Sequence, residues 1–215
     1  MKIFWNEATT GAPKLSPLWN ALREYFPKVA RPDTEVHLRH VPLSGGYVRT
    51  LYTELLNNRA VVENTITAEE EGFDAVVLGC WADPLWEARE AVDIPVIGIG
   101  EAAMLLATTL GHKFAVITVA PGVVPTIEID LRLYGLEDRA IHRPVRALDP
   151  PSDAELLLES INDPHRRLIP NFERVARVCI EDGAEVIAVG CGYYGPILSR
   201  HGYNEIPDTG VPVVD

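Results

Sequence analysis

Two cysteines occupy the same place in two copies of one short sequence. Residues 70–80 read EEGFDAVVLGC and residues 181–191 read EDGAEVIAVGC, so Cys80 and Cys191 each close a copy. A thiol readily accepts and returns a proton when its surroundings bring its pKa, about 8.5 in the unperturbed side chain, toward neutrality. Two thiols that face each other across a pocket predict removal of a proton from one face of a carbon and its return to the other face. The product would be the mirror-image stereocentre.

A cysteine after a buried strand can also be a small packing residue. Cys179, which lies in an apolar helical pattern, fits that interpretation. The repeated Gly-Cys pair favours chemistry for Cys80 and Cys191, because packing alone does not require the same residue twice. An odd number of cysteines and an N-terminus without a signal-like apolar segment indicate free thiols in a cytoplasmic protein.

The elements that must position these thiols follow a βα pattern. Short apolar runs rich in valine and isoleucine alternate with amphipathic stretches, which is typical of parallel sheets. Self-similarity at a period of about a hundred residues indicates a duplicated domain, because solenoid repeats are shorter. We therefore expect an α/β fold of two pseudo-symmetric lobes, each a four-stranded parallel sheet flanked by helices, with the active site in the cleft between them. The lobes are expected at 1–100 and 101–206, with the segment near 207–215 joining the first.

The expected elements can be placed by residue range. Strands are predicted at 2–6, 35–41, 74–79, 95–98, 113–119, 138–143, 185–190 and 211–214. Helices are predicted at 15–26, 47–71, 84–91, 101–110, 123–134, 152–159, 165–182 and 194–200. The helix at 47–71 is the clearest, because Leu51, Leu55 and Leu56, with Val61, Val62 and Ile66, follow a helical period.

Candidate site residues cluster at strand ends. Parallel α/β sheets bind ligands beyond the carboxyl ends of their strands, and Asn6, Cys80, Thr118 and Cys191 all follow or end predicted strands. If the lobes face each other, these four side chains converge on one pocket. A cysteine between a strand and a helix also faces free backbone N–H groups and the positive end of a helix dipole, which favour the thiolate.

These residues carry a resemblance to the aspartate/glutamate racemase superfamily, and within it to the hydantoin racemase branch. The matching segments are Gly79-Cys80 with Asp83-Pro84, the run DIPVIGIGEA at 93–102, Gly190-Cys191, and VPVVD at 211–215. The resemblance implies a cofactor-independent active site between two lobes, with Cys80 and Cys191 as the acid/base pair. It also implies substrate contacts from Asn6, from Thr118 and from the backbone amides after each cysteine, namely those of Trp81, Ala82, Gly192 and Tyr193.

The chain departs from the family pattern in two segments. Hydantoin racemases open with a loop of the Asn-Pro-Asn-Thr type, whereas residues 6–10 read NEATT, so only Asn6 is matched. Amino-acid racemases usually have a threonine after the second cysteine, whereas Gly192 and Tyr193 follow Cys191 here. This difference favours a cyclic or aromatic substrate over free aspartate or glutamate. Family members are expected to continue into a closing helix beyond the position of Asp215.

Neighbouring side chains suggest supporting roles. Asp83, which precedes a proline at a helix start, is expected to cap that helix rather than to tune Cys80 or contact substrate. Trp81 and Tyr193, each close behind a cysteine, are the aromatic residues expected to line an apolar pocket. The other aromatic candidates are Trp86, Tyr194 and Tyr47.

Several function classes are disfavoured. The net charge of −12 and the lack of a long Lys/Arg cluster argue against nucleic acid, and no apolar run is long enough to span a membrane. The GxGxxA sequence at 98–103 lacks a following acidic residue for a ribose, so no dinucleotide is expected. No metal is expected, because His37 and His40 would point to opposite faces of a strand. The four lysines do not suit a pyridoxal phosphate site.

Three hypotheses follow. The first is a cofactor-independent racemase or epimerase that acts on a small carbon acid, hydantoin or amino-acid-like, and works as a homo-oligomer. The second keeps the fold but performs arylmalonate-type decarboxylation or maleate-type cis-trans isomerisation. The third is a protein that binds a small anion without catalysis.

Overall fold

The structure is a computed structural model that describes residues 1–46 and 49–215. Contacts divide the chain into two units, Met1–Ile99 and Gly100–Asp215. The expected division, after residue 100, lies one residue further along the chain. Each unit holds a mainly parallel sheet flanked by helices, so the predicted α/β fold is confirmed. Tyr47 and the start of the predicted 47–71 helix lie outside the described residues.

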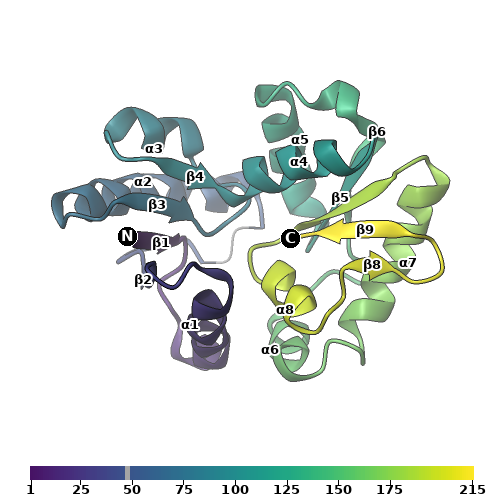
Figure 1. Ribbon diagram of the computed structural model, residues 1–215, viewed down its shortest axis with the longest axis horizontal. Coiled ribbons are helices and arrows are strands. Elements are labelled where there is room, and N and C mark those ends of the chain that lie inside the picture. The colour runs from purple at the N-terminus through teal and green to yellow at the C-terminus, as the bar shows by residue number, and fades with distance from the viewer. Residues whose placement is uncertain (47–48) are drawn as a thin grey trace. The chain divides into compact units, whose positions relative to one another are not determined.

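The first unit contains a four-stranded parallel sheet in the order β2-β1-β3-β4. Its strands are β1 (Lys2–Glu7), β2 (Glu35–His40), β3 (Ala75–Leu78) and β4 (Val96–Gly98). Its helices are η1 (Pro13–Leu15), α1 (Ser16–Val29), α2 (Leu51–Glu70) and α3 (Leu85–Ala91). In Figure 1, α1 lies on one side of these strands and α3 on the other, where α3 packs beside α2.

Helix α2 buries a face other than that of its first leucines. Its first turn is closed by Thr50, whose hydroxyl accepts the Thr53 N–H. The predicted helix is confirmed for Leu51–Glu70, but Leu51, Leu55 and Leu56, which follow the helical period, are 46–67% exposed. The helix instead buries a narrow stripe of small and polar side chains, made of Asn57, Ala60, Val61, Thr65 and Ala68. The polar members of this stripe can reach the polar carboxyl end of β1, which leucines could not satisfy.

The second unit contains a five-stranded sheet in the order β6-β5-β7-β9-β8. Its strands are β5 (Phe114–Thr118), β6 (Ala140–Ala147), β7 (Val186–Gly190), β8 (Glu205–Ile206) and β9 (Val211–Val214). Its longer helices are α4 (Ile99–Leu110), which begins at the division, α5 (Val124–Leu133), α6 (Ala154–Asn162), α7 (Leu168–Glu181) and α8 (Tyr194–Arg200). Two short 3-10 helices, η2 (Pro121–Val123) and η3 (Glu137–Arg139), flank α5. Figure 1 shows α6 beside α8, and α7 next to β8.

The two sheets share a strand order. β6-β5-β7-β9 repeats the order of β2-β1-β3-β4, as expected of a duplication. Two details differ from the prediction. β8 is an additional short strand that pairs antiparallel with β9 through Ile206 and Val211. The C-terminal segment also belongs to the second unit, because β9 pairs with β7 through Ile187 and Val213, rather than joining the first.

The central strands of both units carry many of the buried apolar side chains. All five residues of β5 and all five of β7 are buried, which is typical of parallel strands covered on both faces. Phe4, Val76 and Leu78 are completely buried in the first unit.

No helix within residues 1–46 and 49–215 is long and apolar enough to cross a membrane.

Candidate functional site

Cys80 follows the central strand β3 of the first unit at a turn that depends on Gly79. A Cβ atom on Gly79 would lie 2.5 Å from Trp5 Nε1 and 3.0 Å from the Asn6 carbonyl oxygen. That oxygen also accepts the Gly79 N–H at 2.9 Å. The neighbouring strand β1 therefore approaches too closely for any side chain at this position. Cys80 is half-buried directly after this contact, so its sulfur is held at the carboxyl end of the sheet.

The side chain of Asp83 holds the Cys80 turn from the other side. Its Oδ2 accepts the backbone N–H of Cys80 at 2.9 Å. Helix α3 has Pro84 at its N-cap position and no side-chain cap. The prediction that Asp83 caps this helix is therefore wrong: proline needs no N–H partner at the helix start, and the carboxylate turns back to the amide three residues earlier.

Asn6 is the penultimate residue of β1 and is completely buried. Its Nδ2 donates to the Val61 carbonyl oxygen at 2.8 Å and to Thr65 Oγ1 at 3.0 Å, and its Oδ1 accepts from Asn64 Nδ2 at 2.8 Å. These bonds use both amide hydrogens and tie the end of β1 to the polar stripe of α2. In this structure the Asn6 side chain thus holds the end of β1 against α2. Direct contact between Asn6 and substrate stays a prediction.

Trp81 and Ala82 lie just beyond the first thiol. Both residues are buried, each with 4% of its surface exposed. Their backbone N–H groups donate to no other residue within the described parts of the chain. Buried backbone donors are almost always paired with protein, water or ligand. These two amides therefore suit an oxygen atom of a bound molecule.

Cys191 follows the central strand β7 of the second unit in the same way. A Cβ atom on Gly190 would lie 2.7 Å from Val116 Cγ1 and 3.2 Å from the Ile117 carbonyl oxygen. As at Gly79, the neighbouring strand leaves no room for a side chain. The Cys191 N–H donates to the Val189 carbonyl oxygen at 2.8 Å, and the thiol is half-buried. Each unit therefore has one half-buried cysteine outside any disulfide at an equivalent turn.

Hydroxyl groups lie around the second turn. Thr118 is buried at the end of β5, and its hydroxyl donates to the Gly190 carbonyl oxygen at 3.0 Å. Tyr194, at the start of α8, is 2% exposed and its hydroxyl lies 2.5 Å from Ser152 Oγ. Gly192 and Tyr193 are half-buried between the thiol and this anchor. Thr118 thus supports the turn, and its contact with substrate stays a prediction.

The third cysteine has different surroundings. Cys179 is completely buried in α7, and burial raises the pKa of its thiol to about 11. A thiol with a raised pKa in an apolar environment is unreactive. The interpretation of Cys179 as a packing residue agrees with this environment.

His40, at the end of β2, packs beside the loop that follows β1. Its Nδ1 lies 3.1 Å from the Thr9 carbonyl oxygen, and its ring lies 4.7 Å from that of Trp19. Burial lowers the pKa of His40 below its usual 6.5. This histidine is therefore held neutral, as a structural support of the loop. No group of three His, Cys, Asp or Glu side chains suits a metal within residues 1–46 and 49–215.

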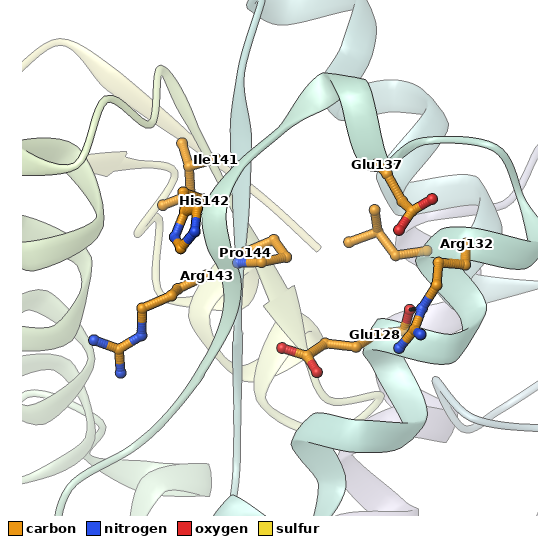
Figure 2. A pocket seen from close by; sticks show the side chains of 8 residues that line it. Glu128, Arg132, Glu137, Ile141, His142, Arg143 and Pro144 are labelled. Atoms are coloured by element: carbon orange, nitrogen blue, oxygen red, sulfur yellow. Dashed lines mark hydrogen bonds between the residues drawn. The ribbon is translucent and has the colours of Figure 1, made fainter.

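A pocket of about 240 Å³ lies elsewhere in the second unit, between α5 and β6. Figure 2 shows Glu128 pointing toward Pro144, whereas His142 and Arg143 lie on the opposite side of the β6 ribbon. Arg143 has a φ of 62° within an irregular stretch of β6. No predicted site residue lines this pocket.

Sequence reasoning missed two contacts that shape the turns. The bond between Asp83 and Cys80 was detectable in principle, because a carboxylate three residues after a turn residue can reach back to its amide. The bond between Ser152 and Tyr194 joins residues far apart in the sequence, and no local signal indicates it.

Comparisons with known proteins agree with this arrangement. The family model described as Asp/Glu/hydantoin racemase matches residues 18–215. Hydantoin racemase from Pseudomonas sp. (strain NS671) is 33% identical over 195 residues, which cover 86% of this chain and 71% of that protein. Hydantoin racemase from Rhizobium meliloti is 42% identical over 150 residues, covering 68% of this chain and 57% of that protein. Allantoin racemase from Pseudomonas fluorescens has a TM-score of 0.80 at 30% identity, over 100% of this chain and 85% of that one.

Three findings indicate the same family. They are the matched family model, the identity to curated relatives and the two equivalent Gly-Cys turns. The match covers far more than half of the chain, and it includes both cysteines and the strands that carry them. The chain therefore belongs to the Asp/Glu/hydantoin racemase family and is a hydantoin racemase-like isomerase.

Proposed function

We propose that this protein racemises cyclic ureides of the hydantoin type, with Cys80 and Cys191 as the two proton carriers. The single observation behind this proposal is the duplicated turn, in which a glycine without room for a side chain is followed by a half-buried cysteine that forms no disulfide. A purely structural cysteine would not need the same tight turn in both units. The proposal requires the two units to present their thiols to opposite faces of one substrate carbon.

The reaction needs one thiolate and one thiol. The thiolate removes the proton from the ring carbon next to the carbonyl, and the electron pair of that C–H bond moves into the enolate. The thiol on the opposite face then donates its proton to the same carbon. Inversion results, and the two sulfurs have exchanged protonation states.

The developing enolate oxygen needs hydrogen-bond donors. The backbone amides of Trp81 and Ala82 have no other partner in the described chain, and they follow Cys80 directly. Gly192 offers a further backbone N–H beside Cys191. Such preorganised amides commonly contribute a factor of about 10²–10³ each to the rate. We assign them to the substrate oxygens, and Tyr193 to the rim beside the ring substituent.

Relatives favour a cyclic substrate. The named relatives are hydantoin racemases and an allantoin racemase, both of which act on rings with a urea-type N–C(=O)–N unit. Gly192 and Tyr193 follow Cys191 in place of the threonine that would help to hold an amino-acid carboxylate. We therefore expect a neutral ring to be preferred over free aspartate or glutamate.

Location and assembly are part of the proposal. The proposed mechanism needs Cys80 and Cys191 reduced, and a reducing compartment such as the cytoplasm keeps cysteines in that state. Leu105, Leu106 and Leu110 on α4 are each about half exposed, which favours burial in a homo-oligomer. Native mass measurement of the purified protein tests the assembly.

The test is chiral analysis of enantiopure 5-substituted hydantoins, allantoin, aspartate, glutamate and an arylmalonate, each against an enzyme-free blank. We expect racemisation of the ring compounds and loss of it in both Cys80→Ser and Cys191→Ser. Carbon dioxide release from the arylmalonate that needs one cysteine would instead identify a decarboxylase. Full racemisation by either serine variant would refute the two-thiol mechanism.

A further inference from the structure

Each unit has a buried asparagine on the helix that leads into its cysteine-bearing strand. Asn57 on α2 is 1% exposed, and Asn171 on α7 is 9% exposed. Asn57 lies 13 residues before Glu70 and Asn171 lies 10 residues before Glu181, the first residues of the two repeated sequences. The two positions therefore differ by about one helical turn, and residues one turn apart lie on the same face of a helix. The duplication thus places a buried amide side chain at nearly the same point in both units.

Asn57 joins two loops of the first unit. Its Oδ1 accepts the Gly45 N–H at 2.6 Å, and its Nδ2 donates to the carbonyl oxygens of Ala8 at 3.1 Å and Gly46 at 3.2 Å. Ala8 directly follows β1, whereas the two glycines lie in the segment after β2. Strand β1 lies between β2 and β3 in the sheet. One side chain thus ties together the loops that follow two neighbouring strands, beside the strand that leads to Cys80.

The segment after β2 approaches α2 unusually closely. A Cβ atom on Gly45 would lie 2.9 Å from Leu56 Cδ1 and 3.0 Å from Leu56 Cβ, so a side chain at this position would force a shift. Gly46 has a φ of 99°, which residues with a side chain rarely adopt. The two glycines therefore let this segment bring its backbone within hydrogen-bond reach of the Asn57 amide.

Asn171 holds the corresponding segment of the second unit. Its Oδ1 accepts the Asp149 N–H at 3.1 Å, and its Nδ2 donates to the Pro150 carbonyl oxygen at 2.9 Å. Both bonded residues follow β6, whose place in the second sheet matches that of β2 in the first. The same segment reaches the loop after β5, because the Ser152 N–H donates to the Val119 carbonyl oxygen at 2.9 Å. In both units, an amide side chain therefore restrains the loop beyond the strand that lies two places from the cysteine-bearing strand.

We propose that Asn57 and Asn171 are positioning residues, which hold these two loops in place as walls of the substrate site before substrate binds. The inference rests on the proposed racemase function, and it goes beyond that function by naming the residues that preorganise the site. Both loops lie beyond the carboxyl ends of parallel strands, which is where sheets of this kind bind ligands. Loops in such places open readily unless buried contacts and hydrogen bonds hold them.

KM is the quantity that should respond to loss of either amide. A loop without its hydrogen bonds is ordered for only part of the time, and the apparent affinity for substrate falls in proportion to the ordered fraction. Bound substrate orders the loop again, so kcat should change little. An asparagine that only supported packing would lower the free energy of unfolding without a selective effect on KM.

The deciding variants are Asn57→Leu and Asn171→Leu, which keep a branched side chain and remove its hydrogen bonds. For an enantiopure 5-substituted hydantoin, we expect KM to rise about tenfold with kcat changed by less than about threefold, since loss of buried hydrogen bonds changes equilibria by that order. Asn57→Asp keeps the acceptor for the Gly45 N–H and loses both donors, and it replaces the leucine variant if that protein does not fold. Asn58→Leu is the matched control, because the neighbouring Asn58 side chain bonds no loop within residues 1–46 and 49–215.

Hydrogen exchange without substrate gives a second readout, which does not depend on activity. Peptides covering 41–46 should exchange faster in Asn57→Leu and those covering 148–153 faster in Asn171→Leu, each variant changing its own segment. If the wild type racemises nothing in the chiral assay, the proposed function fails, whereas the exchange measurement still tests whether the amides hold the loops. Unchanged exchange in folded variants would overturn the inference. A KM within about twofold of the wild type in an active variant, or an equal rise in Asn58→Leu, would overturn it as well.

Discussion

Replacing Gly79 with alanine tests whether the close approach of β1 sets the position of Cys80. The added Cβ would meet Trp5 Nε1 at 2.5 Å, Asn6 O at 3.0 Å and Trp5 Cε2 at 3.1 Å. One contact is with backbone, and the indole ring packs against Phe26 at 4.8 Å, so neither neighbour can move freely. Overpacking of this kind costs about 1–3 kcal/mol. Restricting the unfolded chain offsets roughly 0.4–1 kcal/mol of that cost.

The expected net loss is about 1–2 kcal/mol, which corresponds to a fall in Tm of roughly 2–8 °C for a protein of this size. Because a displacement near 1 Å can cost about a hundredfold in rate, the loss of kcat should be larger than the loss of stability suggests. Gly98→Ala is the control, since the nearest atoms its Cβ would meet belong to the Leu85 side chain, at 3.0 Å and beyond, and none of them is a backbone atom. Thermal unfolding and chiral assays of both variants measure these effects. A Gly79→Ala protein with wild-type Tm and kcat would refute the reasoning.

Three further predictions concern other parts of the two units. Iodoacetamide at pH 8 should modify Cys80 and Cys191 in the native protein but leave Cys179, whose pKa is raised to about 11, unmodified until denaturant is added; peptide mass spectrometry would expose early labelling of Cys179 as a contradiction. The folded-state pKa of His40 is lowered by burial, so the stability it contributes is present above about pH 6.5 and is lost as pH falls through the folded pKa. Denaturant titrations between pH 7.5 and 5 should therefore show a shallower decline for His40→Gln than for the wild type, and identical slopes would refute this. Thr118→Val removes the bond to the Gly190 carbonyl oxygen and should lower the free energy of unfolding by about 1 kcal/mol. In the chiral assay we expect kcat to fall while the affinity for substrate changes little, and an unchanged kcat would show that this bond does not position Cys191.

Local patterns were sufficient to locate most of the fold. The apolar runs at 113–119 and 185–190 become β5 and β7, which are buried along their whole length and therefore leave a continuous signal in the sequence. β8 has only two residues, Glu205 and Ile206, and its pairing with β9 depends on the path of the chain rather than on composition. The placement of residues 207–215 was wrong for the same reason, since the partner of a strand is a long-range choice.

Hydrophobic periodicity located α2 but did not reveal its buried face. The leucines at the start of that helix follow the helical period but are exposed, whereas the buried face combines small and polar side chains, whose polar members bond Asn6 and the loop after β1. Asn57 illustrates this, since its side chain donates to the carbonyl oxygens of Ala8 and Gly46. Hydrophobic periodicity detects apolar faces only. It cannot identify a polar side chain that is buried because it hydrogen-bonds another segment of the chain.

The candidate thiols were predictable because duplication marks them. Cys80 and Cys191 each follow a glycine in the repeated sequence, so comparing the two copies distinguishes them from Cys179. The role of Asp83 was predicted wrongly, because proline at a helix start makes a cap the usual interpretation and only coordinates reveal the reversed direction of its carboxylate. The positions of the two Gly-Cys turns could thus be predicted from the repeat, whereas the bond between Asp83 and the Cys80 amide required the structure.

Isotope exchange at the substrate carbon tests the central claim most directly. An enantiopure 5-substituted hydantoin is incubated in heavy water with wild type, Cys80→Ser or Cys191→Ser, and both deuterium content and configuration are followed against an enzyme-free blank. The account predicts deuterium in the inverted product for the wild type, and no inversion in either variant, with at most exchange from one face that retains configuration. Inversion at the wild-type rate in Cys80→Ser or Cys191→Ser would contradict it.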